Sequence, residues 1–255
     1  MLTPERWALG GLAALLIGFS KTGLPSVGIL AVSLMALVFQ GRAAVGTTVV
    51  LLIVADLFAV AWYRRYTRWD KLWQLLPWVA SGMLIGAVTL LLVGEDAQGR
   101  DQLNVWIGGL VLAMLGIYLV RLRWATQLPS DSRSALIVTG SAAGFATTVS
   151  NAASPIMSIY MTSLGLPKHE FMGTTAWYFL MFNVAKLPLY LLVTLIAPQR
   201  PLFTAEGLIF DLVVSPAVLL GAWLGRWALP RLPQRLFDAL VLGLSAVTAL
   251  TLILG

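Results

Sequence analysis

The fold of this chain is decided by two polar breaks in apolar regions, Ser20-Lys21-Thr22-Gly23-Leu24-Pro25-Ser26 near the start and Thr147-Thr148-Val149-Ser150-Asn151-Ala152-Ala153-Ser154-Pro155 near the middle. Apolar stretches flank each break, at about 6–19 and 24–39 and at about 134–149 and 152–164. Each stretch is shorter than the roughly 20 residues that a membrane-spanning helix needs. Each pair therefore predicts a re-entrant hairpin or two thin spans. The shortness favours the hairpin, whose non-helical backbone must line a protein-buried cavity.

The composition indicates an integral membrane protein. Of 255 residues, 59% are hydrophobic and only 11% are charged, whereas a soluble domain carries roughly a quarter charged residues. The net charge of +6 is spread over short loops and does not indicate nucleic-acid binding. The chain has no cysteine and one histidine, His169, so thiolate chemistry is excluded and no metal-ligand cluster of the usual spacing is present. We predict no cofactor and no metal.

Longer apolar stretches follow each broken pair, at about 44–63, 73–93 and 103–121 and at about 171–196, 206–228 and 235–254. Three blocks of motifs recur in the same order in both parts of the chain. They are Gly18-Phe19 with Gly144-Phe145, Gly46-Thr47-Thr48 with Gly173-Thr174-Thr175, and Pro77, Gly82 and Gly86 with Pro216, Gly221 and Gly225. This order predicts two repeats, 1–125 and 126–255, within one integrated membrane domain. The paired glycines at helical spacing are expected to be packing sites.

Charge predicts how the repeats are oriented. Basic residues gather in four loops, at 64–72, 121–133, 165–170 and 226–235. With five segments per half all four loops fall on one side, which the positive-inside rule makes cytoplasmic. The second repeat is then inverted and both termini lie outside. We therefore predict an all-α polytopic membrane protein of two inverted repeats, each with a short broken helical hairpin plus three transmembrane helices, or 8–10 membrane segments in all.

The breaks predict an anion site. Inverted repeats with interrupted helices are typical of secondary transporters, whose substrate binds at the repeat interface. Pro25 and Pro155 stand near the first turn of the helix after each break, and that helix directs free N–H groups and a positive dipole end into the break. Lys21 and Lys186 lie within apolar regions, where a charge usually faces a cavity or a partner. With the hydroxyl and amide donors nearby, the predicted substrate-binding residues are Ser20, Lys21, Thr22, Ser26, Thr47, Ser150, Asn151, Ser154, Thr174 and Lys186.

Asp56 is an acidic residue that, like the two lysines, lies within an apolar stretch. Its equivalent in the second repeat is Asn183, so both positions are polar. Asp56 is expected to neutralise a lysine or to take up a proton during coupling. A purely structural Lys–Asp pair remains an alternative, as do capping and packing roles for the hydroxyl residues.

The order of these motifs resembles the TauE/SafE (TSUP) family of sulfite exporters. The resemblance rests on Gly18-Phe19-Ser20-Lys21-Thr22-Gly23 followed by Pro25, on the echo at Gly144-Phe145 and on the repeated Gly-Thr-Thr segments, and it covers almost the whole chain. It implies a transporter of sulfite, sulfoacetate or a related sulfur-containing anion, working without ATP in a bacterial inner membrane. Only the two break regions are carried over from the family as its substrate site. The expected partners are the small anion and the lipid bilayer.

The function expected is secondary transport by alternating access, with two alternatives. An intramembrane phosphatase of the undecaprenyl-pyrophosphate type would need a glutamate cluster and a Ser/Arg loop in the membrane. Here no arginine lies in either break, and the glutamates stand at segment ends or in loops: Glu5, Glu95, Glu170 and Glu206. A passive anion channel would have the same cavity without alternating access. The chain lacks a Gly-x-x-x-x-Gly-Lys-Ser/Thr loop, which argues against ATP hydrolysis.

Overall fold

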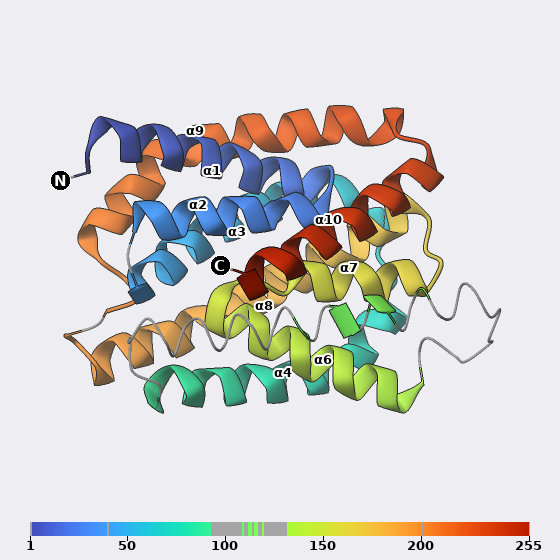
Figure 1. Cartoon of the computed structure of the whole chain (residues 1–255), viewed down its shortest axis with the longest axis horizontal. Coiled ribbons are helices and arrows are strands. Elements are labelled where there is room, and N and C mark those ends of the chain that lie inside the picture. Colours follow the sequence, from blue (N-terminus) through green and yellow to red (C-terminus); the bar gives the residue numbers. More distant parts are fainter. Residues whose placement is uncertain are drawn as a thin grey trace.

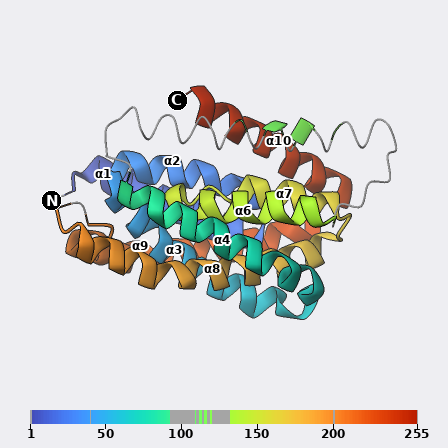
Figure 2. The same cartoon turned by 90° about the horizontal axis from the view of Figure 1, so that it is seen from below.

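The structure, a computed structural model, describes residues 2–39, 41–92, 132–199 and 201–254, together with residues 109, 112, 113, 115, 116 and 119. The predicted segment 103–121 and the loop before it lie almost entirely outside this set. Throughout the described ranges the chain forms helices and no strand, which confirms the all-α prediction (Figures 1 and 2). The helices are α1 (Pro4–Thr22), α2 (Gly28–Val38), α3 (Gly41–Tyr63), α4 (Trp69–Leu92), α6 (Arg133–Ser150), α7 (Ser154–Ser163), α8 (Lys168–Ile196), α9 (Ala205–Ala228) and α10 (Gln234–Leu254).

Four of these helices are long and apolar enough to cross a membrane. The spans are Arg42–Tyr66, Trp69–Leu91, Lys168–Ile196 and Ala205–Arg231. They correspond to α3, α4, α8 and α9, the third and fourth predicted segments of each half. Large apolar side chains such as Leu195 and Leu212 are exposed on their outer faces, at 69% and 77%. Lipid is the solvent that such surfaces require, so the chain is a multi-pass membrane protein.

The two broken pairs form helical hairpins. In each pair the second helix is short, with 11 residues in α2 and 10 in α7, so each extends about 15 Å, or half of the apolar core of a bilayer. The first helices are longer than the sequence indicated, with 19 residues in α1 and 18 in α6. The apolar pattern underestimated the length of α1 for two reasons. A Thr3 cap starts the helix before the apolar run, and the polar residues up to Thr22 continue it.

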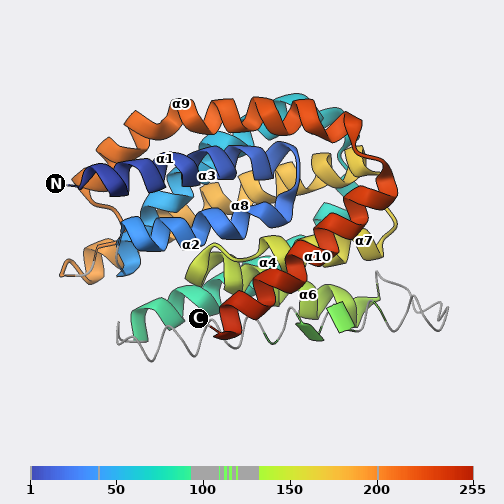
Figure 3. The same cartoon turned by 45° about the horizontal axis from the view of Figure 1, so that its top comes forward.

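Each hairpin packs against a long helix of the other half of the chain, and the two hairpins do so in the same way. Helix α1 packs along α9, α6 packs along α4, and α3 packs against α8 (Figures 1 and 3). A Cβ at Gly18 would lie 1.9 Å from the Val218 carbonyl oxygen, and a Cβ at Gly144 would lie 2.1 Å from the Val79 carbonyl oxygen. These glycines hold equivalent positions in the two repeats, and so do their contacts. The matching way in which each hairpin packs on the other half supports the inverted-repeat prediction, which stays a prediction.

The glycines predicted as packing sites also have this role. Gly82 and Gly221 would place a Cβ within 2.1 Å and 1.9 Å of the carbonyl oxygens of Ser141 and Leu15. Backbones can approach this closely only where no side chain intervenes. The packing prediction for these glycines is confirmed.

Three of the predicted basic loops lie together at one end of the molecule. Lys168 Nζ donates to the Leu229 carbonyl at 3.0 Å, and Arg68 forms an ion pair with Glu170 at 3.1 Å. Figure 1 shows α3 and α9 ending, and α4, α8 and α10 beginning, at this same end. We call it the basic-loop end.

The close contact of α1 with α9 generates a stability prediction. Gly18→Ala should lower the free energy of unfolding in detergent by about 1–3 kcal/mol, because the added methyl group collides with a backbone carbonyl. Gly11→Ala is the matched control, since a Cβ at Gly11 on the same helix meets nothing within 4 Å. Equal stability of the two variants would contradict the proposed packing.

Candidate functional site

The two helix breaks meet inside the molecule. Figure 1 shows the hairpins entering from opposite ends of the long axis and turning in its middle part. The first break runs through Gly23 and the 3-10 turn η1 (Pro25–Val27), and the second runs from Asn151 to Ala153. The Ser154 hydroxyl donates to the Pro25 carbonyl at 2.8 Å, which joins the breaks directly. Segments from the two halves thus form one polar region.

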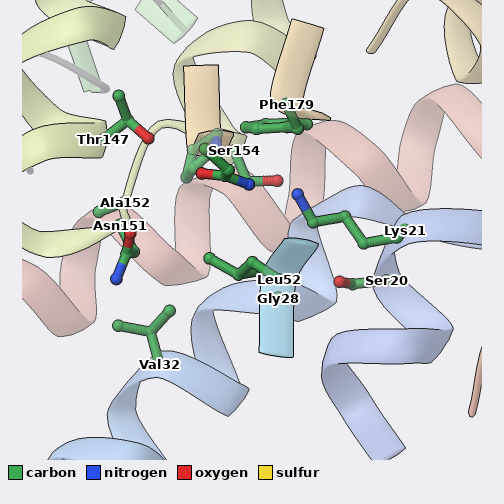
Figure 4. Close-up of a pocket in the computed structure, with 12 residues that line it drawn as sticks. Ser20, Lys21, Gly28, Val32, Leu52, Thr147, Asn151, Ala152, Ser154 and Phe179 are labelled. Atoms are coloured by element: carbon green, nitrogen blue, oxygen red, sulfur yellow. The ribbon is translucent and has the colours of Figure 1, made fainter. Parts of the chain in front are cut away.

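A pocket lies between the breaks (Figure 4). The cavity is small in this structure, with a volume of about 20 Å³. Both hairpins and the paired helices α3 and α8 contribute to the walls. The lining residues are Ser20, Lys21, Gly28, Val32, Leu52, Thr147, Asn151, Ala152, Ser154, Pro155, Phe179 and Asn183.

Lys21 supplies the cation of the pocket. Its ammonium lies 2.8 Å from the Asp56 carboxylate and 3.6 Å from the centre of the Phe179 ring. The side chain is 9% exposed, whereas that of Asp56 is fully buried. Asp56 also accepts from the Asn183 amide at 2.6 Å, which joins the equivalent positions of α3 and α8. The acid and the ring hold the ammonium at the pocket wall, and the amide holds the acid.

Lys186 donates hydrogen bonds to the second break but does not line the pocket. Its ammonium donates to the Thr147 carbonyl at 3.0 Å, to the Thr147 hydroxyl at 3.1 Å and to the Asn151 side-chain oxygen at 2.6 Å. An ammonium has three hydrogens, so these acceptors use all of them. Lys186 is therefore not at the pocket wall but orients two residues that are.

Asn151 shapes the turn of the second break. Its backbone adopts the left-handed conformation with φ of 56°, which asparagine tolerates better than most residues. Its amide nitrogen donates to the Val45 carbonyl of α3 at 3.0 Å. The residue therefore ends α6, accepts from Lys186 and ties the second hairpin to the first half.

Four of the predicted binding residues line the pocket: Ser20, Lys21, Asn151 and Ser154. Thr22 and Ser150 lie in the breaks but donate to backbone carbonyls, Thr22 to Ala222 at 2.7 Å and Ser150 to Ala146 at 3.2 Å. The side chain of Ser26 lies outside the described part of the structure.

The Gly-Thr-Thr threonines are not among the lining residues. Thr174 accepts from the Arg68 N–H at 3.0 Å at the start of α4, and Thr47 lies against Gly207 at the start of α9. They occupy equivalent places beside the first turn of a spanning helix. The structure therefore places both away from the pocket, next to helix starts.

Eight lining residues were absent from the predicted set: Gly28, Val32, Leu52, Thr147, Ala152, Pro155, Phe179 and Asn183. Phe179 and Asn183 stand on α8 seven and three residues before Lys186, a spacing that puts all three on one helical face. That periodicity, started from the buried lysine, could have identified them. Within the described ranges no group of three His, Cys, Asp or Glu side chains is placed to hold a metal ion.

The fold and the site define a polytopic α-helical membrane protein with a cation-bearing pocket where two broken hairpins meet. The profile of the family described as sulfite exporter TauE/SafE matches residues 10–252 of the chain. The chain therefore belongs to the TauE/SafE sulfite exporter family, a family of transporters, and the resemblance found in the sequence is confirmed. No curated protein and no solved structure gives a significant match.

The buried ion pair generates a coupling prediction. Lys21→Met alone leaves the Asp56 carboxylate buried beside a single amide and should cost about 3–5 kcal/mol of stability. Lys21→Met with Asp56→Asn removes both charges and should recover much of this loss. Equilibrium unfolding of both single variants and the double variant in detergent measures the coupling. Additive losses would contradict a direct pair.

Proposed function

We propose that the chain is a secondary transporter, not an enzyme, that moves a small sulfur-containing anion across the membrane by alternating access. Sulfite, sulfoacetate and similar organosulfonates are the proposed substrates, bound between the two helix breaks. The observation that carries the proposal is a pocket to which both breaks contribute and whose wall carries the Lys21 ammonium. Membership of a sulfite exporter family supports the substrate class.

Two helix starts add to the attraction for an anion. Gly28 stands at the start of α2, and Ser154 and Pro155 stand at the start of α7, and all three line the pocket. The positive end of each helix dipole lies at these starts. The Gly28 N–H donates to the Pro25 carbonyl and Pro155 has no N–H, so the dipole is the contribution of these residues. Two such ends and an ammonium favour a group with several anionic oxygens, as sulfite and sulfonates have.

The Lys21–Asp56 pair supplies a means of coupling. An anion that binds the ammonium competes with Asp56, which remains bonded to Asn183. We propose that Asp56 is the charge partner of Lys21 when the pocket is empty. When the anion occupies the pocket, Asp56 takes up a proton or pairs with another group. Exchange of Lys21 between the carboxylate and the substrate would then link binding to the packing of α1 on α3.

The proposed location is the inner membrane of a bacterium, with the basic-loop end in the cytoplasm and both termini in the periplasm. The clustering of basic loops at one end supports this orientation. Because the chain has no cysteine, single cysteines can report it. Arg65→Cys at the basic-loop end and Gln199→Cys at the opposite end are both exposed positions. We expect a membrane-impermeant maleimide added to intact cells from outside to label only the cysteine at 199. Labelling of the cysteine at 65 alone would reverse the orientation.

Binding to purified protein tests the proposed function. A calorimetric or thermal-shift screen of sulfite, thiosulfate, sulfoacetate, sulfate and phosphate should show saturable binding of at least one sulfur oxyanion or sulfonate. The Lys21→Met/Asp56→Asn double variant keeps the packing of the neutralised pair but lacks the ammonium, so its affinity should fall by about tenfold or more.

The control variant is Lys71→Met, which removes the same charge from the first turn of α4, away from the pocket. It should bind as the wild-type protein does. Equal affinity of the double variant and the wild type would remove Lys21 from the site. Saturable flux into proteoliposomes at transporter-like turnover, without large single-channel currents, separates a transporter from a channel.

A further inference from the structure

Helix α7 carries hydroxyl side chains at intervals of four residues, starting from the pocket. Ser154 lines the pocket, and Ser158 and Thr162 follow one and two turns later on the same helical face. We call these three residues the hydroxyl stripe. The helix runs from the pocket to the basic-loop end, where the chain continues through Gly165 to Lys168 and the start of α8 (Figure 1).

Two hydroxyls of the stripe are buried without a hydrogen-bond partner among the described residues. Ser158 is 1% exposed and Thr162 is 8% exposed, and neither side-chain oxygen has a partner. Buried hydroxyls are normally satisfied, so each exception calls for an explanation.

Other buried threonines in this molecule make the hydrogen bond that Ser158 and Thr162 lack. Thr48, Thr148 and Thr175 each donate to the carbonyl four residues earlier, at 2.6, 2.9 and 2.8 Å. This is the ordinary solution for a hydroxyl within a helix. Ser158 and Thr162 do not use it, although helix α7 offers the same carbonyls. Their donors therefore remain available to something else.

The stripe has no counterpart in the first half. At the offset of 126 residues that relates the hairpins, the equivalent positions on α2 are Gly28, Val32 and Ala36. Gly28 and Val32 border the pocket with apolar surface. Of these two helices, α7, which leads to the basic-loop end, carries polar side chains onward from the pocket at this spacing, and α2, which leads away from that end, does not.

We propose that Ser158 and Thr162 form, with Ser154, the path by which the anion passes between the pocket and the basic-loop end. The proposal rests on the proposed transport function and deepens it. The hydroxyls replace part of the anion's hydration shell in successive steps, as donors to oxyanion oxygens. Both are buried in this structure, so the path is closed here, and passage requires the elements packed on α7 to separate.

Flux and binding measured on the same variants test the path. In Ser158→Ala/Thr162→Val the side-chain volumes are nearly kept and both donors are lost. We expect the flux of radiolabelled sulfite into proteoliposomes to fall about tenfold or more, while sulfite affinity measured by calorimetry stays at the wild-type value. Thermal stability should be unchanged or higher, because the hydroxyls removed are unpartnered.

The control is Thr175→Val, which removes a buried hydroxyl that is satisfied within its own helix. It should leave the sulfite flux unchanged. Wild-type flux in the double variant would overturn the path. So would an equal fall in affinity, which would assign these residues to the pocket, or a fall in thermal stability, which would make them structural. If the wild-type protein itself neither binds nor carries sulfite, the proposed function with this substrate falls, and the path falls with it.

Discussion

The polar contacts that satisfy the two helix breaks are the constraint on which the rest of the structure depends. A break leaves backbone N–H and C=O groups without helical partners, and in an apolar membrane each such group costs several kcal/mol unless the protein satisfies it. Here the partners come from other segments. Ser154 donates to the Pro25 carbonyl, Lys186 donates to Thr147 and Asn151, and Tyr63 donates to the Thr22 carbonyl at 2.8 Å. The long helices must pack where they do for these bonds to form.

The two halves satisfy the backbone groups at their breaks with different polar side chains. In the first half the cation, Lys21, stands at the break and its acid, Asp56, stands on the neighbouring helix α3. In the second half the lysine, Lys186, stands on the neighbouring helix α8 and neutral acceptors stand at the break. The equivalent positions Asp56 and Asn183 meet between the halves. The two predicted repeats thus differ at a few polar positions, which give one lysine at the pocket wall, one lysine behind the second break and one hydroxyl stripe.

Much of the fold could be predicted from the sequence because its signals are strong in a membrane. Apolar length identifies the spanning helices, and repeated glycines such as Gly82 and Gly221 identify the contacts that bring backbones together. The candidate site was predictable as a region, since several polar residues and a proline together interrupt the apolar run at each break. A proline alone does not mark a break, because Pro77, Pro188 and Pro216 lie inside continuous helices. Individual residues were less predictable. Whether Ser20 or Thr22 faces the pocket depends on how α1 docks on α9, where Thr22 bonds to Ala222. Helical spacing alone does not contain that information.

An anion is proposed to bind where the two breaks meet, and the position of a bound anion tests this most directly. Selenite has the geometry and charge of sulfite, and selenium scatters anomalously. Crystals of the protein grown with selenite should show an anomalous peak between the Lys21 ammonium and the polar groups of Asn151 and Ser154. A peak confined to the basic-loop end, or no peak at selenite concentrations that saturate binding in solution, would contradict the account.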